Sequence, residues 1–280
     1  MIEHGPGGEV VAAAQTVPSE PPASLPAETT VAAFFDLDNT VLRGASVFHL
    51  AKGLYRREFF TGRDIAAMLW KQVYFSVKGE NLNHVAQIRE QALGFVAGHS
   101  VAEIARIGEE VYDEVMADKI WPGTRALAEG HLESGDDVWL VTASPVEVAT
   151  VIADRLGLTG ALGTVAESVD GIYTGRLVGD AVHGPAKAVA VEALASERGY
   201  DLARCAAYSD SANDIPMLSL VGYPCAVNPD AALRQHARAQ GWQVRDFRNG
   251  RRAAKLGIRA AGATALAGAL AAAATRRRSH

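Results

Sequence analysis

Between residues 122 and 240, short apolar runs alternate with stretches that have the residue pattern of helices. The apolar runs are rich in Val, Leu, Ala and aromatic residues and are bounded by Gly, Pro or Asp, as buried strands are. Strands are expected at 137–142, 205–209 and 224–227, and helices at 122–135, 145–156, 185–198, 215–221 and 229–240. This alternation predicts an α/β fold with a doubly wound, Rossmann-like parallel sheet.

An earlier apolar run, 31–35, ends in two closely spaced aspartates, Asp36 and Asp38, and reads as the first strand. Residues 46–119 instead have a helical pattern and no clear strand alternation. We therefore expect residues 31–45 and 120–250 to form the Rossmann-like core, with 46–119 inserted as a helical cap domain.

Two local signals refine this division. Ser100, followed three residues later by Glu103, predicts a capping box for a helix that begins at residue 101. An Asp-Gly pair at 170–171 predicts a hairpin between strands 163–169 and 172–178.

The two ends of the chain differ from the rest in composition. Residues 1–30 hold five of the 11 prolines and show no hydrophobic period, so we expect a disordered leader. Residues 251–280 form a basic, Ala-rich tail with seven Lys or Arg and no acidic residue. The tail is expected to be a solvated helix or to make weak peripheral contact with anionic membranes, and the sequence leaves both open.

Charge and cysteine content exclude several classes of protein. Residues 1–250 carry 20 basic and 32 acidic residues and so have a formal net charge of −12, which disfavours binding to nucleic acid. The two cysteines, Cys205 and Cys225, lie in apolar runs and are too few for a disulfide framework. We therefore expect buried thiols and a cytoplasmic location, and the oligomeric state stays open.

Polar side chains follow three of the expected strands and begin one helix. In a doubly wound sheet, ligands bind outside the carboxyl ends of the strands, so these side chains should meet at one edge. The expected set is Asp36, Asp38 and Thr40, then Thr142, Ala143 and Ser144, then Lys187, then Asp210, Asn213 and Asp214. Crowded carboxylates favour Mg²⁺, and a Lys with hydroxyl and N–H donors favours phosphate, so the edge is expected to carry out phosphoryl transfer.

These segments resemble, in the same order, the four motifs of the haloacid dehalogenase-like superfamily. The motifs here read Asp-Leu-Asp-Asn-Thr (36–40), Thr-Ala-Ser (142–144), Lys187 and Ser-Asp-Ser-Ala-Asn-Asp (209–214). The helical insertion after the first strand is similar to the cap of the phosphoserine phosphatase-like branch. The resemblance covers about residues 31–247, and its strength lies in the four motifs together, because the first alone is common.

The resemblance implies roles for the four aspartates. Asp36 would attack phosphorus and form an aspartyl-phosphate, and Asp38 would protonate the leaving alcohol and then activate water. Mg²⁺ would be held by the Asp36 carboxylate, the Asp38 main-chain carbonyl and Asp210, with Asp214 in support.

The resemblance also implies how the phosphoryl group is bound. Thr142 and Lys187 would contact its oxygens, and Asn213 would help to orient it. Ala143 and Ser144 belong to the same motif and are further candidates for binding the phosphoryl group or the substrate. We expect Ser144 to cap the helix that starts at residue 145 rather than to contact phosphate directly.

Two further positions bear on the identity of the substrate. Phosphoserine phosphatases of this branch typically have an acidic residue nine positions after the nucleophile to hold the substrate ammonium, and here that position is Ala45. Arg89 is a loose candidate for binding a substrate carboxylate. The expected function is Mg²⁺-dependent hydrolysis of another small-molecule phosphate ester. The alternatives are a phosphoserine phosphatase, a phosphotransferase or mutase, and a non-catalytic regulator that binds phosphate.

Overall fold

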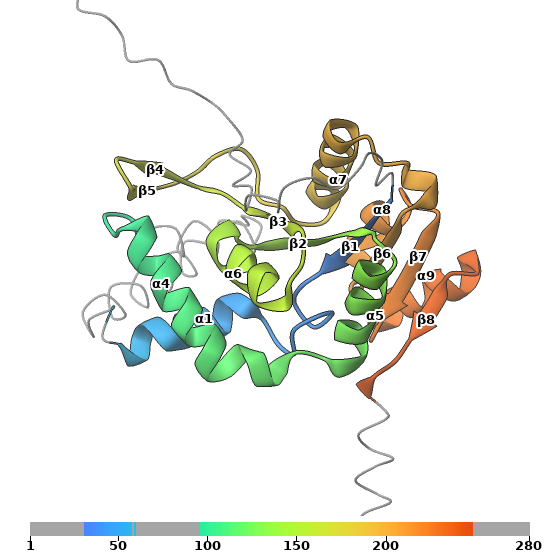
Figure 1. Cartoon of the computed structure of the whole chain (residues 1–280), viewed down its shortest axis with the longest axis horizontal. Coiled ribbons are helices and arrows are strands. Elements are labelled where there is room, and N and C mark those ends of the chain that lie inside the picture. The colour runs from blue at the N-terminus through green and yellow to red at the C-terminus, as the bar shows by residue number, and fades with distance from the viewer. Residues whose placement is uncertain (1–30, 58, 60–95, 249–280) are drawn as a thin grey trace, which may run out of the picture.

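The structure, a computed structural model, describes residues 31–57, 59 and 96–248, and its main feature is a parallel sheet of six strands (Figure 1). The order β3-β2-β1-β6-β7-β8 places β1 in the interior of the sheet. The strands are β1 (Ala32–Asp36), β2 (Asp137–Pro145), β3 (Gly160–Thr164), β6 (Ala206–Ser209), β7 (Tyr223–Val227) and β8 (Gln243–Arg245). The predicted doubly wound α/β fold is confirmed. The expected leader, the tail and Arg89 lie outside the described residues.

Helices cover both faces of this sheet because β1 is apolar on both sides. The side chains of a strand point alternately to opposite faces. Phe35 packs in one cluster with residues of α5 (Pro122–Glu133) and α6 (Val146–Leu156). Phe34 packs in the other, where the partners come from α7 (Pro185–Arg198), α8 (Ile215–Leu218) and α9 (Ala231–Gln240). The two clusters fix the sheet between its helical layers.

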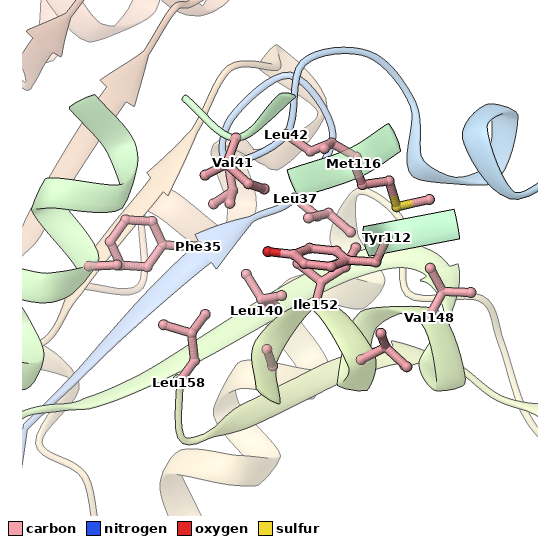
Figure 2. Packing of buried hydrophobic residues seen from close by; sticks show 14 of the residues in the cluster. Phe35, Leu37, Val41, Leu42, Tyr112, Met116, Leu140, Val148, Ile152 and Leu158 are labelled. Carbon is pink, nitrogen blue, oxygen red and sulfur yellow. The ribbon is translucent and has the colours of Figure 1, made fainter. Parts of the chain in front are cut away.

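The described part of the expected cap contains α1 (Ser46–Arg56), α4 (Val101–Val111), a π-helical turn, Tyr112–Met116, and a 3₁₀ turn, Ala117–Lys119. Leu50 and Leu54 of α1 pack in the same buried cluster as the apolar residues of α4. Figure 2 shows Tyr112 and Met116 beside Leu37, just beyond β1. These contacts join α1 and α4 to the core, whereas the cap as a separate domain stays a prediction.

The expected hairpin is present, but its first strand begins at residue 166 rather than at residue 163. The hairpin consists of β4 (Ala166–Val169) and β5 (Ile172–Leu177), and its turn residues Asp170 and Gly171 have positive φ values of 52° and 75°. Residues 163 and 164 belong instead to β3, which pairs in parallel with β2 in the main sheet. Gly163 permits this approach, because a Cβ there would lie 2.6 Å from the Val146 Cα.

Other boundaries differ from the sequence predictions by a few residues. A 3₁₀ turn, Ala212–Asp214, precedes α8, and β8 was not expected. The predicted start of a helix at residue 101 is confirmed by α4, but the predicted capping box is wrong, since Ser100 makes no side-chain bond to the start of that helix. Within the described ranges, no helix has the length and apolar character needed to cross a membrane.

Candidate active site

The chain turns sharply after β1 and so brings several polar groups to the carboxyl edge of the sheet. The N–H groups of Val41 and Leu42 both donate to the carbonyl of Leu37, at 3.0 and 2.9 Å, which closes a compact loop. The hydroxyl of Thr40 donates to Asp210 Oδ1 at 3.4 Å. The first motif is thereby linked to the loop that follows β6.

A buried lysine joins two of the predicted aspartates. Lys187, near the start of α7, lies with its Nζ 2.5 Å from Asp36 Oδ1 and 2.7 Å from Asp214 Oδ2. Ser209 also donates to Asp214 Oδ2, at 2.7 Å. Each of these side chains is at least nine-tenths buried. The ammonium group therefore fixes the position of the Asp36 carboxylate relative to α7 and to the loop after β6.

The electrostatics of the site favour a further cation. Burial raises the pKa of Asp36 to about 6 although Lys187 acts to lower it, and burial together with the charges of Asp36 and Asp214 raises the pKa of Asp210 to about 7. Burial also acts to lower the pKa of Lys187, but the two adjacent carboxylates outweigh it and raise that pKa. One ammonium group thus does not neutralise the three carboxylates, and a divalent cation would stabilise their ionised forms.

The site offers two carboxylates as possible ligands for Mg²⁺. In the described part of the chain, no group of three or more His, Cys, Asp or Glu side chains is arranged to hold a metal. Mg²⁺ commonly binds through one or two carboxylates and keeps several waters, so it does not need such a group. Asp36 and Asp210 satisfy this requirement, whereas the Oδ2 atom of Asp214 already bonds to Lys187 and Ser209.

The second motif lies at the end of β2, next to β1. The N–H of Ser144 donates to Thr142 Oγ1 at 3.1 Å, so the buried Thr142 hydroxyl retains its own proton to donate. The carbonyl of Ala143 accepts a bond from Thr164 at 2.8 Å. The expected capping role of Ser144 is wrong, because β2 continues to Pro145 and α6 begins without a side-chain cap.

Ser46 is a site residue that sequence reasoning missed. Its N–H and hydroxyl both contact Asp38 Oδ1, at 2.8 and 2.7 Å, and its Oγ lies 2.5 Å from Ser144 Oγ. Its position at the expected start of the cap was the only local signal. Asn213, by contrast, is exposed in the turn Ala212–Asp214, and its N–H donates to Ser211 Oγ.

Comparison with known proteins identifies the family of the chain. The sequence model of the haloacid dehalogenase-like hydrolases matches residues 33–219. The chain is 57% identical to the Mycobacterium tuberculosis H37Rv protein named phosphoserine phosphatase SerB1, over 91% of this chain and 83% of that protein.

Two solved structures are also similar. A Bordetella pertussis Tohama I protein of unknown function is 34% identical, with a TM-score of 0.68 over 78% of this chain and 98% of its own. A phosphoserine phosphatase with an analogue of its phospho-aspartyl intermediate gives a TM-score of 0.52 over 78% of this chain and 95% of its own, and its 19% identity supports the fold alone. The chain therefore belongs to the haloacid dehalogenase-like hydrolases and is a phosphatase of that family.

Proposed function

We propose that this phosphatase hydrolyses a small-molecule phosphate monoester with Mg²⁺, through an aspartyl-phosphate on Asp36. The observation that carries the proposal is the buried Asp36 carboxylate, held by Lys187 at the carboxyl edge of the sheet. Lys187 contacts Oδ1, which leaves Oδ2 as the oxygen that attacks phosphorus. The ammonium group fixes the nucleophile and offsets the charge of the incoming phosphoryl group.

Asp38 is the proposed acid and base. As the bond between phosphorus and the ester oxygen breaks, Asp38 gives its proton to the leaving alcohol. Asp38 then accepts a proton from the water that attacks the aspartyl-phosphate, which releases inorganic phosphate and regenerates Asp36. Asp38 is less buried than Asp36 and accepts hydrogen bonds from Ser46, whereas Asp36 accepts one from Lys187. The two carboxyl groups therefore have different surroundings, as opposite roles require.

Phosphoryl binding is assigned to Lys187 and to the hydroxyl proton of Thr142. Asp36, Asp210 and the Asp38 carbonyl would hold Mg²⁺, with Asp214 acting through Lys187. When bound, the ion would neutralise charge on the phosphoryl oxygens. The raised pKa values of Asp36 and Asp210 support this assignment, because they indicate carboxylates that lack sufficient counter-charge.

Two observations point to different substrates. The 57% identical relative carries the name phosphoserine phosphatase, which makes phosphoserine the first compound to test. Ala45, which caps the start of α1 without a side-chain bond, offers no carboxylate for the ammonium group of phosphoserine. We favour a small phosphate ester without an amino-acid ammonium group.

A substrate panel tests the proposal. Purified protein would be assayed with phosphoserine, glycerol phosphate, a sugar phosphate and 4-nitrophenyl phosphate, each with Mg²⁺ and with EDTA, beside Asp36→Asn. We expect Mg²⁺-dependent release of phosphate that the variant loses. Equal activity of the wild type and Asp36→Asn would refute the assignment of Asp36 as the nucleophile. A large preference for phosphoserine would refute the inference that, with Ala45 in place of an acidic residue, the substrate has no amino-acid ammonium group.

The phosphotransferase alternative has a separate test. Phosphate released to water and phosphate passed to an added alcohol are distinguished by product analysis with candidate acceptors present. We expect inorganic phosphate as the main product. Transfer that exceeds hydrolysis would favour the phosphotransferase or mutase alternative.

A further inference from the structure

The Asp38 carboxylate is held by the first residue of α1. Ser46 is fully buried, and both its N–H and its hydroxyl reach one carboxylate oxygen, Oδ1. The first N–H groups of a helix have no partner within the helix, and they carry a partial positive charge. The start of α1 therefore supplies two donors to Asp38 from the segment that was expected to form the cap.

The direction of each bond follows from the number of protons available. A hydroxyl has one proton, and Ser46 uses it on Asp38 Oδ1, which can only accept. In the 2.5 Å contact between the two hydroxyls, Ser144 must then be the donor. Since Ser144 is also buried and at the end of β2, a chain of hydrogen bonds runs from the second motif through Ser46 to Asp38.

We propose that Ser46 is a positioning residue that engages Oδ1 of Asp38 and thereby leaves Oδ2 as the oxygen that exchanges the catalytic proton. This inference rests on the proposed function and adds to it. In the first step, the bond from Asp36 to phosphorus forms, the ester P–O bond breaks, and the proton on Oδ2 moves to the leaving oxygen. In the second step, the bond from the water oxygen to phosphorus forms, the bond from phosphorus to Asp36 breaks, and Oδ2 takes a proton from the water as inorganic phosphate leaves. Ser46 neither gains nor loses a proton.

The role of Ser144 changes with this assignment. Its hydroxyl proton is directed to Ser46 and its N–H to Thr142, so neither donor is available to a phosphoryl oxygen. Ser144 instead holds Ser46 against Asp38, while the Thr142 hydroxyl contacts phosphate. Ser144 thus connects phosphate binding, through Thr142, to the orientation of Asp38, through Ser46.

The test uses leaving groups that differ in their need for a proton. An alkyl phosphate releases an alkoxide that must be protonated, whereas 4-nitrophenyl phosphate releases a stable phenolate. The ratio of kcat/KM for the two substrates reports on acid catalysis in the first step, because kcat/KM covers steps up to the first irreversible one. Positioned acids contribute about 10²- to 10⁴-fold, so we expect Ser46→Ala to lower kcat/KM for the alkyl substrate about tenfold or more, and for the aryl substrate less than about threefold.

Two variants serve as controls. Ser46→Thr keeps the hydroxyl and should restore the ratio towards that of the wild type. Ser100→Ala removes the hydroxyl of the residue that precedes α4, where the side chain makes no capping bond, and should change neither constant. If Ser46→Ala does not fold, Ser46→Cys retains the size of the side chain and a weak donor, and it should shift the ratio in the same direction.

A double-mutant cycle with Asp38→Asn separates positioning from a general structural effect. In that background, Ser46→Ala should leave the ratio unchanged, because the acid that it orients is already absent. Equal losses for both substrates, or a shift of the ratio that persists without Asp38, would overturn the inference while leaving the proposed function intact. A wild type that hydrolyses neither substrate would instead refute the proposed function, and the inference with it.

Discussion

Replacing the proposed nucleophile should stabilise the metal-free protein. Burial raises the pKa of Asp36 from 3.8 to about 6. Each pKa unit corresponds to about 1.36 kcal/mol, so ionised Asp36 lowers the free energy of unfolding at pH 7.5 by about 3 kcal/mol relative to a neutral side chain. Asp36→Asn removes the charge and keeps the shape, while Lys187 retains its bond to Asp214.

The pH dependence gives this prediction a definite sign. The native state keeps the proton on Asp36 up to about pH 6, whereas the unfolded chain releases it near pH 4, so the native state binds more protons between these values. The stability of the wild type relative to Asp36→Asn therefore falls as the pH rises through this window. The difference should be about 3 kcal/mol at pH 7.5 and roughly half as large at pH 5.

The assay is denaturation by urea and by heat in EDTA at both pH values. For a chain of this size, about 3 kcal/mol corresponds to a Tm increase of roughly 6 to 12 °C. Asp180→Asn, which alters an exposed aspartate, is the matched control and should leave Tm unchanged. Added Mg²⁺ should stabilise the wild type more than Asp36→Asn. A variant that is no more stable than the wild type in EDTA at pH 7.5 would refute the reasoning.

Three other predictions concern different parts of the structure. Lys187→Met should lower kcat/KM for any substrate at least about hundredfold, because it removes the cation beside the nucleophile, and steady-state kinetics would check this. Gly53→Ala should destabilise the protein by about 1 to 3 kcal/mol in urea denaturation, because the added Cβ would overlap Val111. Gly130 lies within the helix α5, where an added Cβ would contact no other residue, so Gly130→Ala should stabilise the protein by about 0.5 to 1 kcal/mol in the same assay. Ala45→Glu should raise kcat/KM for phosphoserine relative to glycerol phosphate, and an unchanged ratio would count against an ammonium site at that position.

The parallel sheet could be predicted because its signals are local. The strands β1 and β6 are short apolar runs that lead into an aspartate: Asp36 ends β1, and Asp210 directly follows β6. Parallel strands place their carboxyl ends at one edge, so the proximity of these residues to Lys187 follows from topology. The structure brings Asp36, Asp214 and Lys187 into direct contact.

The errors arose where a partner is distant in sequence. Residues 160–164 carry strand signals, but whether they pair with the following hairpin or with β2 depends on tertiary packing. Ser144 has a suitable position for a helix cap, yet its hydroxyl bonds to a residue 98 positions away. Ser46 likewise has no sequence pattern that reveals its contact with Asp38, since the contact requires the loop after β1 to fold back.

The measurement that tests the central claim most directly is the location of the phosphoryl group during turnover. Wild-type protein would be mixed with a labelled phosphate ester and Mg²⁺, quenched in acid, digested and mapped by mass spectrometry. We expect a hydroxylamine-sensitive phosphoryl group on Asp36 that appears at the rate of turnover and is absent from Asp36→Asn. Turnover with no phosphoryl group on Asp36, or a label on another residue, would contradict it.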